Sequence, residues 1–115
     1  MDRIEFGELV IGDTARAHLS DVCDTSWASM GPKVRAFENQ WSALFGYRNS
    51  GAVSSGTDAC INACLSLYDL CNASRGDEII VPALSFIATS NAVRMAGFKP
   101  VFVDVKKETL NIDED

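Results

Sequence analysis

The stretch from Ser54 to Asp58 combines two serines, a glycine, a threonine and an aspartate just before a segment that has the pattern of a helix. The first N–H groups of a helix lack partners within it, and the helix dipole makes that end partly positive. Such an end binds anions, including phosphate groups. Gly56 would let the backbone come close to a bulky oxyanion, and Thr57 could add a hydroxyl and an N–H group. The stretch is therefore a candidate phosphate-binding turn.

A simpler interpretation is that these residues only cap the helix. Ser55 belongs to the residue types preferred at the N-cap, and the Asp58 carboxylate complements the helix dipole. The local pattern leaves both interpretations open, so the elements around the turn have to decide between them.

Two helices are expected before this turn. Asp13 is a suitable N-cap for the first, over residues 13–23, and Pro32 fits the first position of the second. The second helix repeats apolar residues at steps of three and four, which places them on one face, and Gly46 ends it. We expect Phe37 and Trp41 on that face to pack in a core or an interface.

From residue 52 onward, short apolar segments alternate with helical ones. Strands are expected over 52–54, 78–82 and 100–105, and helices over 57–71 and 87–96. The helix over 57–71 is apolar nearly all round and the strand over 78–82 is continuously apolar, so both should be covered on more than one side. The order β-α-β-α-β indicates an α/β fold with a partial parallel sheet, preceded by the N-terminal helices.

Charge and hydropathy exclude several classes of function. The chain has 115 residues and a net charge of −6, with no basic stripe, which argues against nucleic acid and anionic membranes as partners. No apolar run is long enough to span a bilayer, and residues 1–7 lack the apolar core of a signal peptide. We therefore expect a cytoplasmic protein.

The chain has four cysteines and one histidine. A zinc-type site would combine closely spaced cysteines with nearby histidines, but His18 lies far in sequence from the segment that holds most of the cysteines. We predict no metal site and four free thiols that are buried as small apolar groups in a reducing compartment. The cysteines are Cys23, Cys60, Cys64 and Cys71.

Four segments, in this order and spacing, carry a resemblance to a known family. They are SWASMGPKVRAFENQWSALFG (26–46), SSGTDA (54–59), GDEIIVPALSFIATSNAV (76–93) and GFKPVFVDVKKETLNID (97–113). Together they closely resemble the sugar-aminotransferase branch of the fold-type I pyridoxal-phosphate (PLP) enzymes, often called the DegT family. The resemblance extends over nearly the whole chain from about Phe6, and it favours the phosphate interpretation of the turn.

The resemblance implies a domain organisation, a cofactor and binding residues. It implies a helical segment over 1–48 and the incomplete first part of a PLP-binding large domain over 49–115. Gly56 and Thr57 would hold the cofactor phosphate, and Phe86 would stack on the pyridine face. Family members transfer an amino group, usually from glutamate, to a keto-sugar attached to a nucleotide.

The loop that holds Trp27 and Ser29 approaches the active site near the subunit boundary in the family. Here Ala28 stands where the family usually has a larger aliphatic residue, which puts the shape of this loop in doubt.

The resemblance does not extend to two groups that transamination needs. The reaction needs a Schiff-base lysine and a carboxylate at the pyridine nitrogen, and in the family both follow the strand over 100–105. The four lysines present lack the family context and have the pattern of solvated surface charges. They are Lys33, Lys99, Lys106 and Lys107.

We therefore expect no catalytic residue here and an N-terminal portion of a longer enzyme that is inactive alone. The alternative is a non-catalytic remnant, or an assembly or binding module that retains only the phosphate-binding turn.

The resemblance also implies a homo-oligomer. In the family's large domain, the strand over 52–54 is separated from the other two by strands that come later in the sequence. Unpaired buried backbone groups cost about 1–3 kcal/mol each, and exposed strand edges pair with other chains. We expect a dimer or a larger assembly, with the sheet rearranged or completed between chains and a small-molecule phosphate ligand as a further partner.

Overall fold

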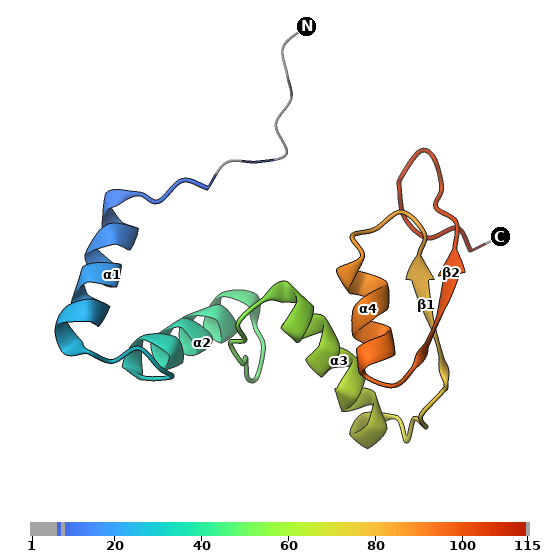
Figure 1. Cartoon of the computed structure of the whole chain (residues 1–115), viewed down its shortest axis with the longest axis horizontal. Coiled ribbons are helices and arrows are strands. Elements are labelled where there is room, and N and C mark those ends of the chain that lie inside the picture. Colours follow the sequence, from blue (N-terminus) through green and yellow to red (C-terminus); the bar gives the residue numbers. More distant parts are fainter. Residues whose placement is uncertain (1–6, 8, 115) are drawn as a thin grey trace, which may run out of the picture. The chain divides into compact units, whose positions relative to one another are not determined.

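The computed structural model describes residue 7 and residues 9–114, which separate into two compact units. The helical unit holds the residues up to Ala52, and the sheet unit begins at Val53. Figure 1 labels the helices and strands of both. The expectation that residues 1–7 lack a signal peptide, and the start of the resemblance near Phe6, fall almost wholly outside the described residues.

The helical unit contains α1 (Asp13–Thr25) and α2 (Pro32–Phe45). Gly12 is the N-cap of α1, so Asp13 lies in the first turn, where its carboxylate favours the helix dipole; its predicted role as N-cap is wrong. Pro32 opens α2, and Gly46 ends it in the left-handed conformation with φ of 70°, as predicted.

The loop between α1 and α2 is built around Trp27. The indole N–H donates to the Met30 carbonyl at 3.2 Å. A side-chain carbon on Gly31 would come within 2.4 Å of the indole ring, so a larger residue at this position would require the indole to move. An ion pair of 2.6 Å between Lys33 and Asp21 links the start of α2 to the end of α1.

The aromatic residues of α2 pack on one another instead of entering a core. Phe37 and Trp41 have ring centroids 5.7 Å apart, and Trp41 and Phe45 are 4.6 Å apart. All three remain about half exposed, and every buried hydrophobic residue found in the described chain lies in the sheet unit. The core interpretation of Phe37 and Trp41 is therefore wrong, and the interface interpretation stays a prediction.

The sheet unit contains α3 (Gly56–Leu70), β1 (Glu78–Pro82), α4 (Ala88–Met95) and β2 (Lys99–Val103). β1 and β2 pair in parallel, with Glu78 opposite Lys99 and Pro82 opposite Val103. The connecting helix α4 packs against both strands, and α3 packs against α4. The predicted α/β class with parallel strands is confirmed.

The core of the sheet unit lies between α4 and the strands. Its buried members are Val81, Val93, Ala96 and Phe98. Tyr68 of α3 packs against them, stacks on Phe98 with centroids 4.7 Å apart, and donates its hydroxyl to the Ala96 carbonyl at 2.8 Å. Gly97 turns the chain toward β2 with φ of 93°, and a methyl group there would come within 2.9 Å of the Tyr68 hydroxyl.

Three expectations about the sheet unit are wrong. All three require further elements, either to pair with a strand or to cover a face. The residues over 52–54 form no strand, since a strand needs a hydrogen-bonded neighbour and the described sheet consists of β1 and β2 alone. α3 has no fully buried residue, because it is covered only on the side of α4. Ile80 of β1 is 61% exposed, so the sheet is not covered on both faces.

The cysteines also differ from expectation. Cys23, Cys60 and Cys71 are exposed, and only Cys64, which packs against the core, is half-buried. The prediction that the thiols are buried is wrong for the three exposed ones, because no second layer formed by the described residues covers their side of α1 or α3. All four thiols are free in the structure.

Candidate functional site

The candidate turn is a well-formed helix start. Ser55 is the N-cap of α3, and its Oγ accepts a hydrogen bond from the Asp58 N–H at 3.1 Å, which confirms the capping prediction. The Ala59 N–H donates to the Ser55 carbonyl at 3.1 Å. The N–H groups of Gly56 and Thr57 come before this first helical hydrogen bond and so have no acceptor inside the helix. Capping and anion binding are therefore compatible here, because they use different N–H groups.

The space beside Gly56 is open. A side-chain carbon at this position would have no heavy atom within 4 Å beyond its own chain neighbours and helix backbone. Gly56 is exposed, and Thr57 is half-buried. The described structure thus leaves the backbone of Gly56 accessible to a group as large as a phosphate.

Asp58 brings a negative charge to the same turn. Its Oδ2 accepts hydrogen bonds from the hydroxyls of Ser54 and Ser55, the second at 2.9 Å. These two bonds, first that from Ser54 and then that from Ser55, lower the pKa of the Asp58 carboxyl. The carboxylate engages both hydroxyls, so an incoming anion is left with the amides of Gly56 and Thr57 and with the Thr57 hydroxyl.

Phe86 lies at the same end of the sheet unit as the turn. The helices run opposite to the strands, so the start of α3 and the carboxyl end of β1 lie at one end of the unit, as Figure 1 shows. Phe86 follows β1 in the loop before α4, and its carbonyl accepts from the Thr89 N–H at 3.0 Å. Its side chain is 76% exposed, so the ring is not a core residue.

The lysines are mostly engaged in ion pairs. Lys33 pairs with Asp21, and Lys99 pairs with Glu78, each at 2.6 Å. The hydrogen bond and charge of Glu78 raise the pKa of Lys99, which favours its protonated form.

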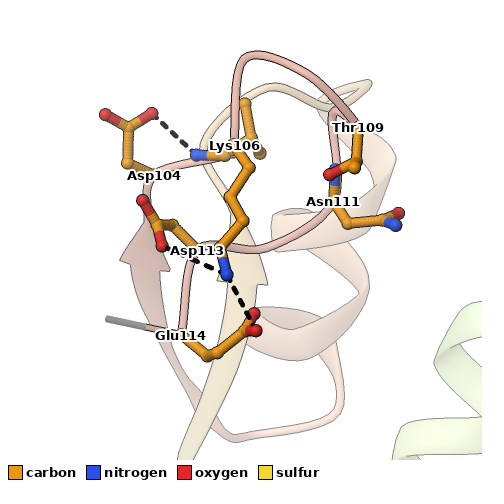
Figure 2. Close-up of polar contacts among 7 residues, drawn as sticks. Asp104, Lys106, Thr109, Asn111, Asp113 and Glu114 are labelled. Carbon is orange, nitrogen blue, oxygen red and sulfur yellow. Dashed lines mark hydrogen bonds and ion pairs between the residues drawn. The ribbon is translucent and has the colours of Figure 1, made fainter.

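Lys106 differs from the predicted solvated charge. Its side chain is 31% exposed and its ammonium lies 2.8 Å from Glu114 and 3.9 Å from Asp113 (Figure 2).

The sequence analysis missed the hairpin that holds Lys106. After β2 the chain turns back, with an isolated antiparallel bridge between Val105 and Ile112. The Lys106 N–H donates to the Asn111 carbonyl and the Asp113 N–H to the Asp104 carbonyl, each at 2.9 Å. The available signal was the placement of turn-forming polar residues between these two apolar positions.

Trp27 and Ser29 line a cavity of about 610 Å³ in the helical unit, between the end of α1 and the start of α2. Gly56, Thr57 and Phe86 belong to the sheet unit. The three predicted cofactor residues thus lie at one end of the sheet unit, whereas the predicted loop residues Trp27 and Ser29 lie in the helical unit.

Two further surveys of the described residues bear on function. No helix among them is both long and apolar enough to cross a bilayer. They contain no cluster of three or more histidine, cysteine or acidic side chains placed to hold a metal ion.

Comparison with known proteins points to one family. Residues 10–115 match the sequence model of the DegT/DnrJ/EryC1/StrS aminotransferase family. The chain is 35% identical over 104 residues to the spore coat polysaccharide biosynthesis protein SpsC of Bacillus subtilis (strain 168), a match that covers 90% of this chain and 26% of that protein.

Solved structures give a consistent picture. GDP-4-keto-6-deoxy-D-mannose-3-dehydratase of E. coli, with bound hydrated PLP, is 31% identical with a TM-score of 0.85, over 98% of this chain and 30% of that one. DesV of S. venezuelae, in complex with a ketimine intermediate, is 32% identical with a TM-score of 0.72, over 85% and 25% of the two chains. The chain thus spans between a quarter and a third of the length of these relatives.

Proposed function

Because this chain belongs to the DegT/DnrJ/EryC1/StrS aminotransferase family, whose cofactor is PLP, we propose that it is the N-terminal portion of a PLP-dependent aminotransferase. The proposed substrates are a nucleotide-linked keto-sugar and glutamate as the amino donor. Residues 49–115 would be the first part of the PLP-binding large domain, and residues 1–48 its N-terminal helical segment. The observation that carries the proposal is the open turn at Gly56 and Thr57, because the start of α3 and the loop from β1 to α4, which contains Phe86, lie at one end of the sheet unit.

The residues at this end fit the cofactor. The amides of Gly56 and Thr57, which precede the first helical hydrogen bond, would hold the phosphate, and the dipole of α3 would favour its charge. The exposed ring of Phe86 would lie against the pyridine face and orient it. PLP, when bound, supplies the electron sink for amino-group transfer. The ionised Asp58 repels the phosphate of the cofactor. We therefore expect the affinity for phosphate to depend on the backbone amides more than on the net charge of the turn.

The 115-residue chain by itself is proposed to be inactive in transamination. Three of its four lysines, Lys33, Lys99 and Lys106, are held by carboxylates, and Glu78 raises the pKa of Lys99. None of these three is therefore a free amine poised to bind the cofactor covalently, and the fourth, Lys107, is an exposed surface charge. Incubation with PLP followed by borohydride reduction should give only scattered, substoichiometric labelling by mass spectrometry. A stoichiometric adduct on one specific lysine would show that the chain carries a reactive amine.

Binding of the phosphate can be tested separately from chemistry. Inorganic phosphate and PLP are titrated into the reduced chain and followed by ³¹P NMR, with weak binding expected because few residues contact the ligand. Gly56→Ala should weaken both ligands at least severalfold, since its methyl group fills the open approach. Phe86→Ala should weaken PLP and leave inorganic phosphate unchanged. Gly51→Ala, also in open space, is the matched control and should change neither. Unchanged binding in Gly56→Ala would refute this assignment.

We also propose that the chain assembles as a dimer or a larger homo-oligomer. This is supported by the half-exposed aromatic rings of α2 and by Ile80 on the uncovered side of the sheet, since large exposed apolar patches mark interfaces. Sedimentation at micromolar concentration is the test. A compact monomer that unfolds cooperatively would contradict it.

A second candidate is dehydration of a nucleotide-linked keto-sugar. It is supported by the match to the E. coli dehydratase, with a TM-score of 0.85 at 31% identity. The two reactions differ in their products, because amino transfer adds nitrogen to the sugar whereas dehydration removes water. Mass spectrometry of the sugar product made by a protein with the complete family domain would distinguish them.

A further inference from the structure

Cys60 and Cys64 are a pair of thiols one helical turn apart on α3. Residues at this spacing lie on one face of a helix, with Cβ atoms about 5–6 Å apart. Cys60 is exposed and Cys64 is half-buried, packed at the edge of the core. The two thiols therefore lie side by side at the surface of the sheet unit, on a helix of 15 residues that holds their spacing constant.

This spacing is unsuited to a disulfide. A disulfide needs Cβ atoms about 3.5–4.5 Å apart, which is closer than the helix holds them. One interposed atom with two bonds to sulfur spans the larger separation without unwinding the helix. Thiolates are soft ligands and bind soft, thiophilic centres in preference to hard cations.

We propose that Cys60 and Cys64 form a dithiol site that captures one trivalent arsenical per chain, bridging the two sulfurs on the surface of α3. With an organoarsenic oxide, two S–H bonds and the arsenic–oxygen double bond break, two arsenic–sulfur bonds form, and one water molecule leaves. Arsenic stays trivalent, so no oxidant or reductant takes part. The site is independent of the cofactor proposal, because it uses neither Gly56 nor Phe86.

The order of bond formation follows from the surroundings of the two thiols. Burial, and secondarily the nearby Cys60, raises the pKa of the Cys64 thiol. Thiolate is the reactive form, so the exposed Cys60 attacks first and Cys64 closes the ring. The neighbouring Cys71 lies seven residues beyond Cys64, about two helical turns away, which is too far for one atom to bridge.

The test uses the reduced 115-residue chain with one equivalent of phenylarsine oxide. The number of thiols titratable with Ellman's reagent should fall from four to two, and the intact mass should show one phenylarsenic group per chain. 2,3-Dimercaptopropanol should restore all four thiols, whereas an equal concentration of a monothiol should not.

Variants assign the site. Cys60→Ser, at an exposed position that keeps the fold, should abolish the stable adduct, and circular dichroism checks that its helix content is unchanged. Cys23→Ser and Cys71→Ser are matched controls and should each retain one adduct, with one titratable thiol remaining. An adduct that survives in Cys60→Ser, or one that links two chains in sedimentation, would overturn the proposal.

Discussion

α2 of the helical unit and α4 of the sheet unit are both regular helices, yet the shorter one is the better buried. α2 has 14 residues and none is buried, whereas α4 has 8 residues and buries Ala92 and Val93. α4 gains this cover because it connects two paired strands and must pack back onto them. The comparison shows that capping residues and local sequence pattern suffice to form a helix. Burial of its side chains requires other elements that the order of the chain brings against it.

The largest effect that would sharpen this comparison is loss of a core aromatic residue. Phe98, 5% exposed and stacked on Tyr68, should cost about 3–5 kcal/mol of unfolding free energy when replaced by alanine. The matched Phe37→Ala variant, 54% exposed in α2, should cost about 1 kcal/mol or less. Urea denaturation followed by circular dichroism measures both. Equal losses would mean that the helical unit has a core of its own.

The turn between α4 and β2 should give the next largest effect. Gly97→Ala places a side chain at φ of 93°, which costs about 1–2 kcal/mol, and pushes it against the Tyr68 hydroxyl. Gly51→Ala in the helical unit meets open space and should leave the unfolding free energy almost unchanged. Thermal unfolding compares them, and a stable Gly97→Ala variant would show that this turn does not hold the α4–β2 connection.

A smaller effect is expected at the start of α3. Ser55→Ala removes the N-cap hydrogen bond to the Asp58 N–H and should cost about 1 kcal/mol. Ser66→Ala is the control, because the Ser66 hydroxyl donates only to the Ala63 carbonyl within the same helix, and alanine suits a helix interior. The two are compared by urea denaturation. Equal stability of both variants would show that the Ser55 cap does not stabilise α3.

The smallest effect concerns pH. The pKa of Asp58 is lowered in the folded chain, so its stabilising contribution is fully present above the ordinary aspartate pKa of about 3.9 and is lost as pH falls through the lower folded-state value. Asp58→Asn should therefore unfold at a lower temperature than the parent near neutral pH, and the gap should narrow in acid. A gap that stays constant between neutral pH and strong acid would contradict this linkage.

The sequence predicted what depends on neighbouring residues. The helices, both observed strands and the Ser55 cap follow from local patterns, and the structure has them within a few residues of their predicted bounds. Burial was harder to predict, because it depends on distant elements. The failed strand over 52–54, the exposed thiols and the exposed sheet face share this cause.

The candidate site shows the same division. Its helix start was predictable, since capping residues act within one turn. The engagement of both serine hydroxyls by Asp58 was not, because side-chain direction is not readable from residue type. The assignment of cofactor contacts to Gly56, Thr57 and Phe86 came from the family resemblance and stays a prediction.

The parallel pairing of β1 with β2 has a consequence for how the chain folds. Glu78 and Lys99 are 21 residues apart, and α4 lies within that interval. The entropy lost in closing a loop of this length is modest, because the cost grows only slowly with loop length. We therefore expect this βαβ segment to be the folding nucleus, onto which α3 docks through Tyr68, and to assemble on the ribosome as soon as β2 has emerged.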